Sequence, residues 1–159
     1  MSTDNYTALR ASKLATELSD EQCRDFASVV SLAHLKDGEV LVHEGTSDDR
    51  LFAVVQGALG VIKSAETEPV TLHTLTAGDL AGELSFLDGT VRYASLVAMG
   101  PTTALVLSRS ALESEIERHP QIVYRVMRGI LRATHAIQRR LSVQQYELSN
   151  YIYKQHGRY

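Results

Sequence analysis

The sequence predicts a mainly β domain with helices at both ends, and three observations support this prediction. Residues 36–108 form short runs rich in β-branched side chains, and glycine-containing turns separate them at even intervals. A capped apolar pattern at helical spacing precedes these runs, and a long helical pattern follows them. Short, evenly spaced strands of this kind indicate an antiparallel sandwich or barrel.

Size and composition limit the classes of protein to consider. The 159 residues are enough for one folded domain with appendages, and 44% apolar with 22% charged residues is typical of a globular chain. No segment approaches the ~20 apolar residues that cross a bilayer, and the first residues contain no apolar run, so neither membrane insertion nor secretion is expected. Cys23 is the only cysteine, which excludes a disulfide within the chain and favours a reducing cytoplasm.

The N-terminal helix and the strands follow from local patterns. Ser19 to Gln22 form a helix-capping sequence, and the apolar series after it predicts an amphipathic helix that runs into a loop; this series is Cys23, Phe26, Ala27, Val30 and Leu35. Six strands are predicted, at Val40–His43, Leu51–Val55, Ala58–Lys63, Val70–Leu75, Ala94–Ala98 and Thr103–Ser108. Residues 77–93 are too long for a hairpin loop and contain a short helical pattern, which is typical of a functional insertion.

The C-terminal region is predicted to be helical, first over Ala111–Arg118 and then in one long stretch after Pro120. Two apolar series with heptad spacing run along this stretch, which indicates the seam of a coiled coil; they are Val123, Ile130, Ile137, Gln144 and Tyr151, and Met127, Thr134, Leu141 and Leu148. A single helix packed on its own barrel is the alternative for the first turns. Beyond Ile137 the helix outruns a small barrel, so a parallel homodimer is expected. The expected organisation is an N-terminal segment 1–17, a domain 18–118 and a dimerisation helix 119–159.

Charge is unevenly distributed along the chain. Residues 1–108 hold 7 basic and 15 acidic side chains, whereas residues 109–159 hold 9 and 4. A basic end attracts acidic partners, but its basic residues lie at helical intervals among apolar ones, so a solvated helix face is the favoured interpretation and nucleic acid a minor one.

The stretch from Gly78 to Ser95 carries the chemistry. A cyclic phosphodiester has one negative charge and several acceptor oxygens, and it therefore fits a guanidinium beside backbone N–H groups at the start of a short helix. Arg92 and the turn at Gly82–Ser85 supply these two groups. Glu83, within the same turn, is an acceptor for a ribose hydroxyl.

This stretch resembles the phosphate-binding cassette of cyclic nucleotide-binding domains, in which Gly-Glu-Leu and a short helix precede an arginine and small residues. Gly82-Glu83-Leu84, Arg92 and Ala94-Ser95 follow that pattern, and the resemblance extends over residues 18–140. It implies a β-roll or jelly-roll barrel with an N-terminal helix and a long C-terminal dimerisation helix. It also implies a cyclic nucleotide, cAMP or cGMP with cAMP favoured, as the ligand of a regulatory sensor that is not an enzyme.

By this resemblance Arg92 pairs with the phosphate oxygens, Glu83 accepts from the 2′-hydroxyl, and backbone groups near Gly82, Leu84 and Ser85 complete the cradle. Leu72 and Leu84 line the sugar and base pocket, and Ala94 follows the arginine. Tyr93 stands where the family usually has a small residue, which leaves the choice between cAMP and cGMP open. The helix after the barrel caps the base in this family, so the predicted contacts there are Thr134, Ile137 and Gln138.

Alternatives remain open at this point. Glu83 and Arg92 also fit a structural ion pair in a ligand-free dimeric interaction module, whose basic end at Tyr146–Tyr159 docks a protein partner. Catabolite-activator-type regulators continue into a DNA-binding domain for which no room follows Pro120, so DNA binding is not expected unless the chain is the sensor fragment of such a regulator. The histidines lack metal-ligand spacing, and no nucleophile motif occurs. No catalytic or metal-binding residue is therefore predicted, and a haem role for His73 is disfavoured.

Overall fold

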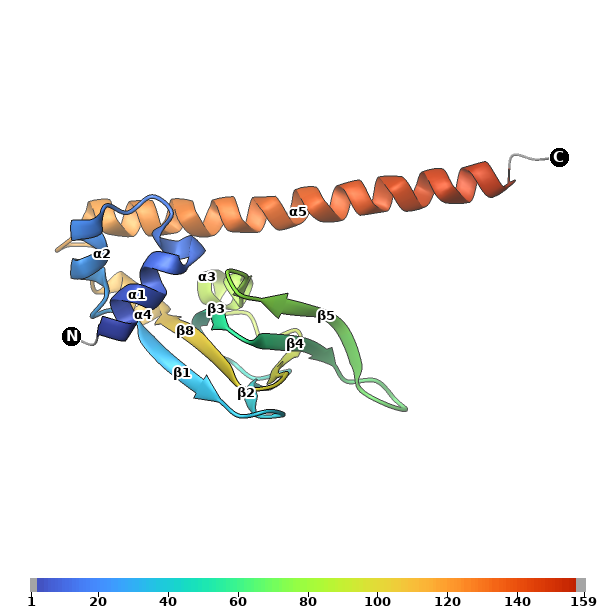
Figure 1. Ribbon diagram of the computed structural model, residues 1–159, viewed down its shortest axis with the longest axis horizontal. Coiled ribbons are helices and arrows are strands. Elements are labelled where there is room, and N and C mark those ends of the chain that lie inside the picture. The colour runs from blue at the N-terminus through green and yellow to red at the C-terminus, as the bar shows by residue number, and fades with distance from the viewer. Residues whose placement is uncertain (1–2, 157–159) are drawn as a thin grey trace.

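Two antiparallel sheets of four strands pack against each other below a long C-terminal helix in this computed structural model, which describes residues 3–156 (Figure 1). One sheet has the strand order β1-β8-β3-β6 and the other β2-β7-β4-β5. The strands are β1 Ser31–Leu35, β2 Val40–Val42, β3 Arg50–Gln56, β4 Ala58–Lys63, β5 Val70–Thr76, β6 Leu80–Ala81, β7 Ser95–Ala98 and β8 Thr102–Ser108. The predicted jelly-roll class is confirmed.

Helices occupy both ends of the chain and the insertion between β6 and β7. They are α1 Thr3–Ala11, the 3₁₀ helix η1 Lys13–Ala15, α2 Asp20–Phe26, α3 Glu83–Asp88, α4 Arg109–Glu113 and α5 Pro120–His156. The predicted cap is present at α2, where the Ser19 hydroxyl accepts from the Gln22 amide and the Gln22 side chain accepts from the Ser19 amide. Within residues 3–156, no helix has the length and the apolar character needed to cross a membrane.

Three local expectations were wrong or incomplete. Leu35 was assigned to the end of a helix and its loop, but Ser31–Leu35 forms β1 and pairs with β8 from Thr102 to Val106; α2 ends before it because the chain turns at residues 27–29. The helices α1 and η1 were not predicted. Helix α4 ends at Glu113, although the pattern extended to Arg118.

The hydrophobic core has two parts. Between the sheets, Phe52 and Leu59 are fully buried together with apolar residues of the remaining strands. Above the sheets, the N-terminal helices, β3, β8 and the first half of α5 share a second cluster, in which Leu9, Phe26 and Val126 are buried. The N-terminal segment therefore belongs to the same packed unit as the start of α5.

The first half of α5 is held on the N-terminal helices at close range. At Gly129 an added Cβ atom would lie 2.9 Å from the Lys13 carbonyl oxygen, so only a glycine permits this approach. The Glu17 carboxylate pairs with the adjacent Arg128 at 2.9 Å from Nε and with Arg132, about one turn further on, at 2.8 Å from Nε. These contacts fix the helix next to the barrel.

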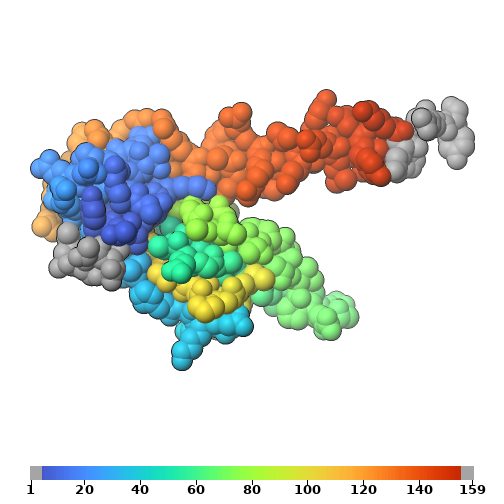
Figure 2. Space-filling view, in the orientation of Figure 1, coloured from blue at the N-terminus to red at the C-terminus, as the bar shows by residue number. Residues whose placement is uncertain are grey.

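The second half of α5 projects beyond the barrel as a rod (Figure 2). No side chain from Gln138 to Lys154 is buried. The predicted dimer seam needs a correction in its first part, because Ile130 is only 2% exposed and lies in the chain's own core, against which Val123 and Met127 also pack. Heptad positions in these turns face the N-terminal helices and a β-sheet, so only the later part of the series is exposed for the predicted pairing with a second copy.

Candidate functional site

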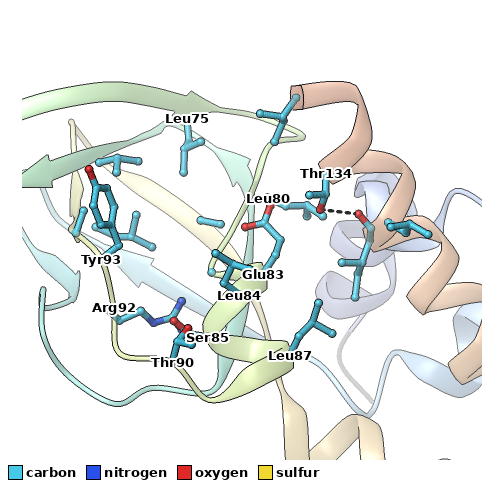
Figure 3. Close-up of a pocket in the computed structure, with 18 of the residues that line it drawn as sticks. Leu75, Leu80, Glu83, Leu84, Ser85, Leu87, Thr90, Arg92, Tyr93 and Thr134 are labelled. Atoms are coloured by element: carbon cyan, nitrogen blue, oxygen red, sulfur yellow. Dashed lines mark hydrogen bonds between the residues drawn. The ribbon is translucent and has the colours of Figure 1, made fainter. Parts of the chain in front are cut away.

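A cavity of about 730 Å³ lies between the barrel, α3 with the loop after it, and the middle of α5 (Figure 3). Its volume is within the range of small-molecule sites in proteins. Ten of the eleven residues predicted to bind a ligand line this cavity. They are Gly82, Glu83, Leu84, Ser85, Arg92, Tyr93, Ala94, Thr134, Ile137 and Gln138.

Leu72 is the predicted contact that does not line the cavity. Its neighbour His73 and the buried Leu75 line it from β5 instead. Side chains alternate between the two faces of a strand, and His73 pairs across the sheet with Val61, which also lines the cavity. Leu72 therefore belongs to the opposite face, where it is 43% exposed.

Gly82 shapes the turn that starts α3. Its φ of +91° is in the left-handed region, and an added Cβ atom would overlap the guanidinium of Arg92 and lie 2.9 Å from the Arg50 carbonyl oxygen. The turn sets the first amide groups of α3, including those of Leu84 and Ser85, at the start of a helix where such groups lack intrahelical acceptors. A glycine here brings the arginine and these amides together.

Arg92 is buried, with 4% of its surface exposed. Its Nη2 donates to Asp48 Oδ1 at 3.0 Å and to the Arg50 carbonyl oxygen, and its guanidinium carbon lies 5.3 Å from the centre of the Phe52 ring. Within residues 3–156, its buried Nε has no hydrogen-bond partner. A buried cationic donor without a partner is costly, so this arginine is arranged to receive a further acceptor.

Glu83 and Arg92 do not form the structural ion pair that was the alternative to ligand binding. Arg92 pairs with Asp48 instead. Within the described residues, the half-buried Glu83 carboxylate makes no hydrogen bond or ion pair, and Figure 3 shows it pointing into the cavity near Leu80. The two charged side chains therefore remain available, one as a donor and the other as an acceptor.

Asp48 is the partner of Arg92 that the sequence did not reveal, because 44 residues separate them. Burial alone would raise the pKa of Asp48, but hydrogen bonds from the Arg50 side chain, from the Arg50 amide and from Arg92 lower it from 3.8 to about 2. The carboxylate is therefore ionised at neutral pH and holds Arg92 in place.

We expect the Asp48→Asn variant to be less stable than the wild type at neutral pH, by about 2 kcal/mol from the lowered pKa. A lowered folded-state pKa stabilises the native state above the unfolded value and loses this effect as pH falls. For Asp48 the window runs from 3.8 to about 2. Urea unfolding at pH 7 and across this window measures both effects, and equal pH slopes for the two proteins would contradict the assignment.

The helix α5 closes the other side of the cavity. Thr134 donates its hydroxyl to the Ile130 carbonyl oxygen at 3.0 Å, the contact drawn in Figure 3. Because its proton is used within the helix, the hydroxyl oxygen presents lone pairs that accept a hydrogen bond. Gln138 stands one turn further along and offers both an acceptor and two donors.

Several lining residues were not predicted. Apolar side chains make up most of this group, and they come from the barrel strands, from α3 and the loop after it, and from α5; they include Val61, Leu75, Leu87, Val91, Tyr124, Met127 and Leu131. Tyr124 and Leu131 are 59% and 67% exposed, respectively. Tyr124 and Leu131 lie seven residues apart and outside the two heptad series, and this spacing was the signal that could have identified a further apolar face of α5.

Nothing in the described residues gathers acidic, histidine or cysteine side chains into a metal-binding cluster. The site combines one buried cation, helix amides, one free carboxylate and an apolar surround. This combination suits a small anion that also carries a hydroxyl group and an apolar or aromatic portion.

Comparison with known proteins identifies a family for this arrangement. Residues 32–119 match the family model of the cyclic nucleotide-binding domain. A cGMP-dependent protein kinase of Caenorhabditis briggsae is 31% identical over 121 residues, which are 73% of this chain and 16% of the kinase. The chain thus corresponds to a small part of that protein.

Solved structures with a similar fold include members of the same family. A cyclic nucleotide-binding domain from Methylobacillus flagellatus is 27% identical, with a TM-score of 0.77 over 86% of this chain and 80% of that one. The catabolite activator protein of Thermus thermophilus is 26% identical, with a TM-score of 0.66 over 86% of this chain and 64% of that one.

Proposed function

The chain belongs to the cyclic nucleotide-binding domain family, and from this premise we propose that it is a sensor that binds one cyclic mononucleotide, with cAMP favoured over cGMP. The observation that carries the proposal is the unpartnered Nε of the buried Arg92. A phosphate oxygen is an acceptor of the right charge for this donor. The matches are to a binding domain, so we infer binding and not catalysis as its role.

The sugar phosphate has a complementary set of groups in the cavity. The phosphate accepts hydrogen bonds from the Arg92 guanidinium and from the first amides of α3, at Leu84 and Ser85. The ribose 2′-hydroxyl donates to the Glu83 carboxylate, which makes no other hydrogen bond or ion pair in the described chain. Each of these contacts involves a charged group and is therefore of the stronger class of hydrogen bond.

The base is expected to extend toward α5, where hydrogen bonds distinguish adenine from guanine. Adenine presents an amino donor beside an acceptor nitrogen on its Hoogsteen edge, whereas guanine presents two acceptors there. The Thr134 oxygen is an acceptor because its own proton goes to Ile130. This favours adenine, and Gln138 adds a second polar contact.

Ligand binding is proposed to act on the position of α5. The cavity is lined both by the phosphate-binding turn and by α5, and Arg128 in its lining is one of the two arginines paired with Glu17. A ligand that fills the space between them favours one position of the helix over others, which is a shift between two states. The change reaches the projecting end of α5, where we propose that a protein partner docks; Gly157–Tyr159 of that end lie outside the described residues.

We also propose that the projecting half of α5 joins two copies of the chain. Leu141 and Leu148 are exposed by 56% and 60% and lie seven residues apart on a segment without buried side chains. An apolar heptad series on a projecting helix is stabilised by a second helix. A cytoplasmic location remains part of the proposal, since the single cysteine Cys23 is buried as a free thiol.

The proposed function is tested by calorimetric titration with cAMP, cGMP and cyclic dinucleotides. We expect cAMP to bind more tightly than cGMP. Glu83→Ala and 2′-deoxy-cAMP should each weaken binding, and their combination should lose little more because both delete the same contact. Full additivity would reject the sugar contact, and no heat from any nucleotide would favour a ligand-free interaction module.

A further inference from the structure

Tyr93 places an aromatic ring in the cavity directly after the phosphate-binding arginine. The side chain lines the cavity and is 68% exposed. Figure 3 shows it on the side of the cavity away from Thr134 and α5. Most of the Tyr93 side chain is therefore available for contact with a molecule that occupies the cavity.

The ring is held in place by Lys63 on β4. The Lys63 ammonium group lies 4.6 Å from the ring centre, within cation–π range, and donates to the Tyr93 carbonyl oxygen at 2.9 Å. Tyr93 lines the cavity whereas Lys63 does not, so the ammonium approaches the ring from outside. One lysine therefore fixes both the backbone and the ring of Tyr93.

Glu44 in turn fixes Lys63. Its carboxylate pairs with the ammonium and accepts from the Ser64 amide at 2.8 Å, while the Glu44 amide donates to the Ser95 hydroxyl at 2.9 Å. Hydrogen bonds from Lys63 and Ser64 lower the pKa of Glu44 to about 2, so the ion pair is intact at neutral pH. Three segments of the barrel thus support the ring.

The position of this ring matters because a cyclic nucleotide has few ways to adapt. Its phosphate ring is rigid, and only the glycosidic bond turns freely. In the anti conformer the base points away from the phosphate, whereas in the syn conformer it folds back over the ribose toward the phosphate. With the phosphate on Arg92, a syn base approaches Tyr93 and an anti base reaches toward α5.

We propose that Tyr93, positioned by Lys63 and Glu44, is a specificity-determining residue that admits the anti conformer of a cyclic nucleotide and excludes the syn conformer. The inference rests on the proposed binding of a cyclic nucleotide at Arg92. Rejection by a fixed, bulky group is a general route to specificity. Exclusion of the syn conformer also directs the base to Thr134 and Gln138, the proposed hydrogen-bond partners of adenine.

The test uses halogenated analogues of cAMP. Bromine at C8 crowds the ribose and favours syn, whereas chlorine at C2 lies on the far edge of the base and leaves anti accessible. We expect the wild type to bind 8-bromo-cAMP roughly tenfold more weakly than cAMP, the effect of a steric clash of modest size. The affinity for 2-chloro-cAMP should stay close to that for cAMP.

Variants then assign the effect to the ring. Tyr93→Ala should bring the affinities for cAMP and 8-bromo-cAMP within about threefold of each other by relieving the clash, whereas Tyr93→Phe keeps the ring and should keep the difference. The ratio of the affinities for cAMP and 8-bromo-cAMP should be intermediate in Lys63→Met, and Lys63→Arg should return it to the wild-type value. This ratio is the readout, because a purely structural role of Lys63 would weaken both ligands equally.

Some results would overturn the inference. Equal affinities of the wild type for 8-bromo-cAMP and cAMP would show that the site does not exclude the syn conformer. A Tyr93→Ala variant that keeps the difference, or that loses cAMP affinity itself, shows that the ring does not act by exclusion. These outcomes leave the proposed function intact, whereas a wild type that binds no cyclic nucleotide rejects both proposals.

Discussion

Replacing Arg92 with alanine is expected to weaken cAMP binding at least about tenfold, the lower range for a charge-assisted hydrogen bond in free-energy terms. The reason is that, among residues 3–156, the guanidinium is the charged donor that lines the cavity beside the first turn of α3. The cAMP affinity of Arg92→Lys should lie between those of the wild type and Arg92→Ala, since an ammonium keeps the charge but loses the planar pair of donors of the guanidinium. Isothermal titration measures all three proteins.

Loss of Arg92 also leaves Asp48 without one partner, so a control must separate binding from folding. Arg50→Ala removes the other arginine on Asp48 and does not touch the cavity lining. We expect this variant to be destabilised yet to lose much less cAMP affinity than Arg92→Ala, because Arg50 shares Asp48 with Arg92 but does not line the cavity. An Arg92→Ala variant that melts as a folded protein and binds cAMP normally would remove Arg92 from the site.

Ten of the eleven predicted contacts line the cavity, and seven of them lie within residues 82–94, the stretch that resembles the phosphate-binding cassette. The glycine, the first turn of the short helix and the following arginine lie within one continuous segment, so the resemblance to the family's cassette placed them residue by residue. Leu72 was misplaced for the opposite reason. A strand directs alternate residues to opposite faces, and the choice between Leu72 and His73 depends on the register with β4, which includes an irregularity near Val61.

Contacts between distant segments were the part that the sequence did not predict. Asp48 contacts Arg92, Lys63 contacts Tyr93 and Glu17 contacts α5 only through the tertiary fold. The same limit applies to α5. Its heptad series is visible in the sequence, but Ile130 serves the chain's own core because η1 packs against Gly129.

This division of α5 determines where a dimer is expected to form. Its roughly 55 Å length at 1.5 Å per residue exceeds what the barrel covers, and the apolar seam that remains unburied is the series that includes Leu141 and Leu148. We expect the wild type to be a dimer at micromolar concentration and the double variant Leu141→Glu with Leu148→Glu to be a monomer. Four carboxylates across a two-fold seam repel one another and lose the apolar contact.

A matched control separates the seam from the general apolar character of the helix. Val143 and Tyr146 are exposed by 56% and 69%, similar to the two leucines, but they lie off the heptad series. Val143→Glu with Tyr146→Glu should therefore remain dimeric in light scattering, with the same change in charge. A wild-type monomer, or a dimer that survives the leucine substitutions, would show that the projecting half of α5 does not pair with itself. Ile137 is left unchanged because it lines the cavity, so cAMP titration of both double variants can report whether ligand affinity depends on assembly.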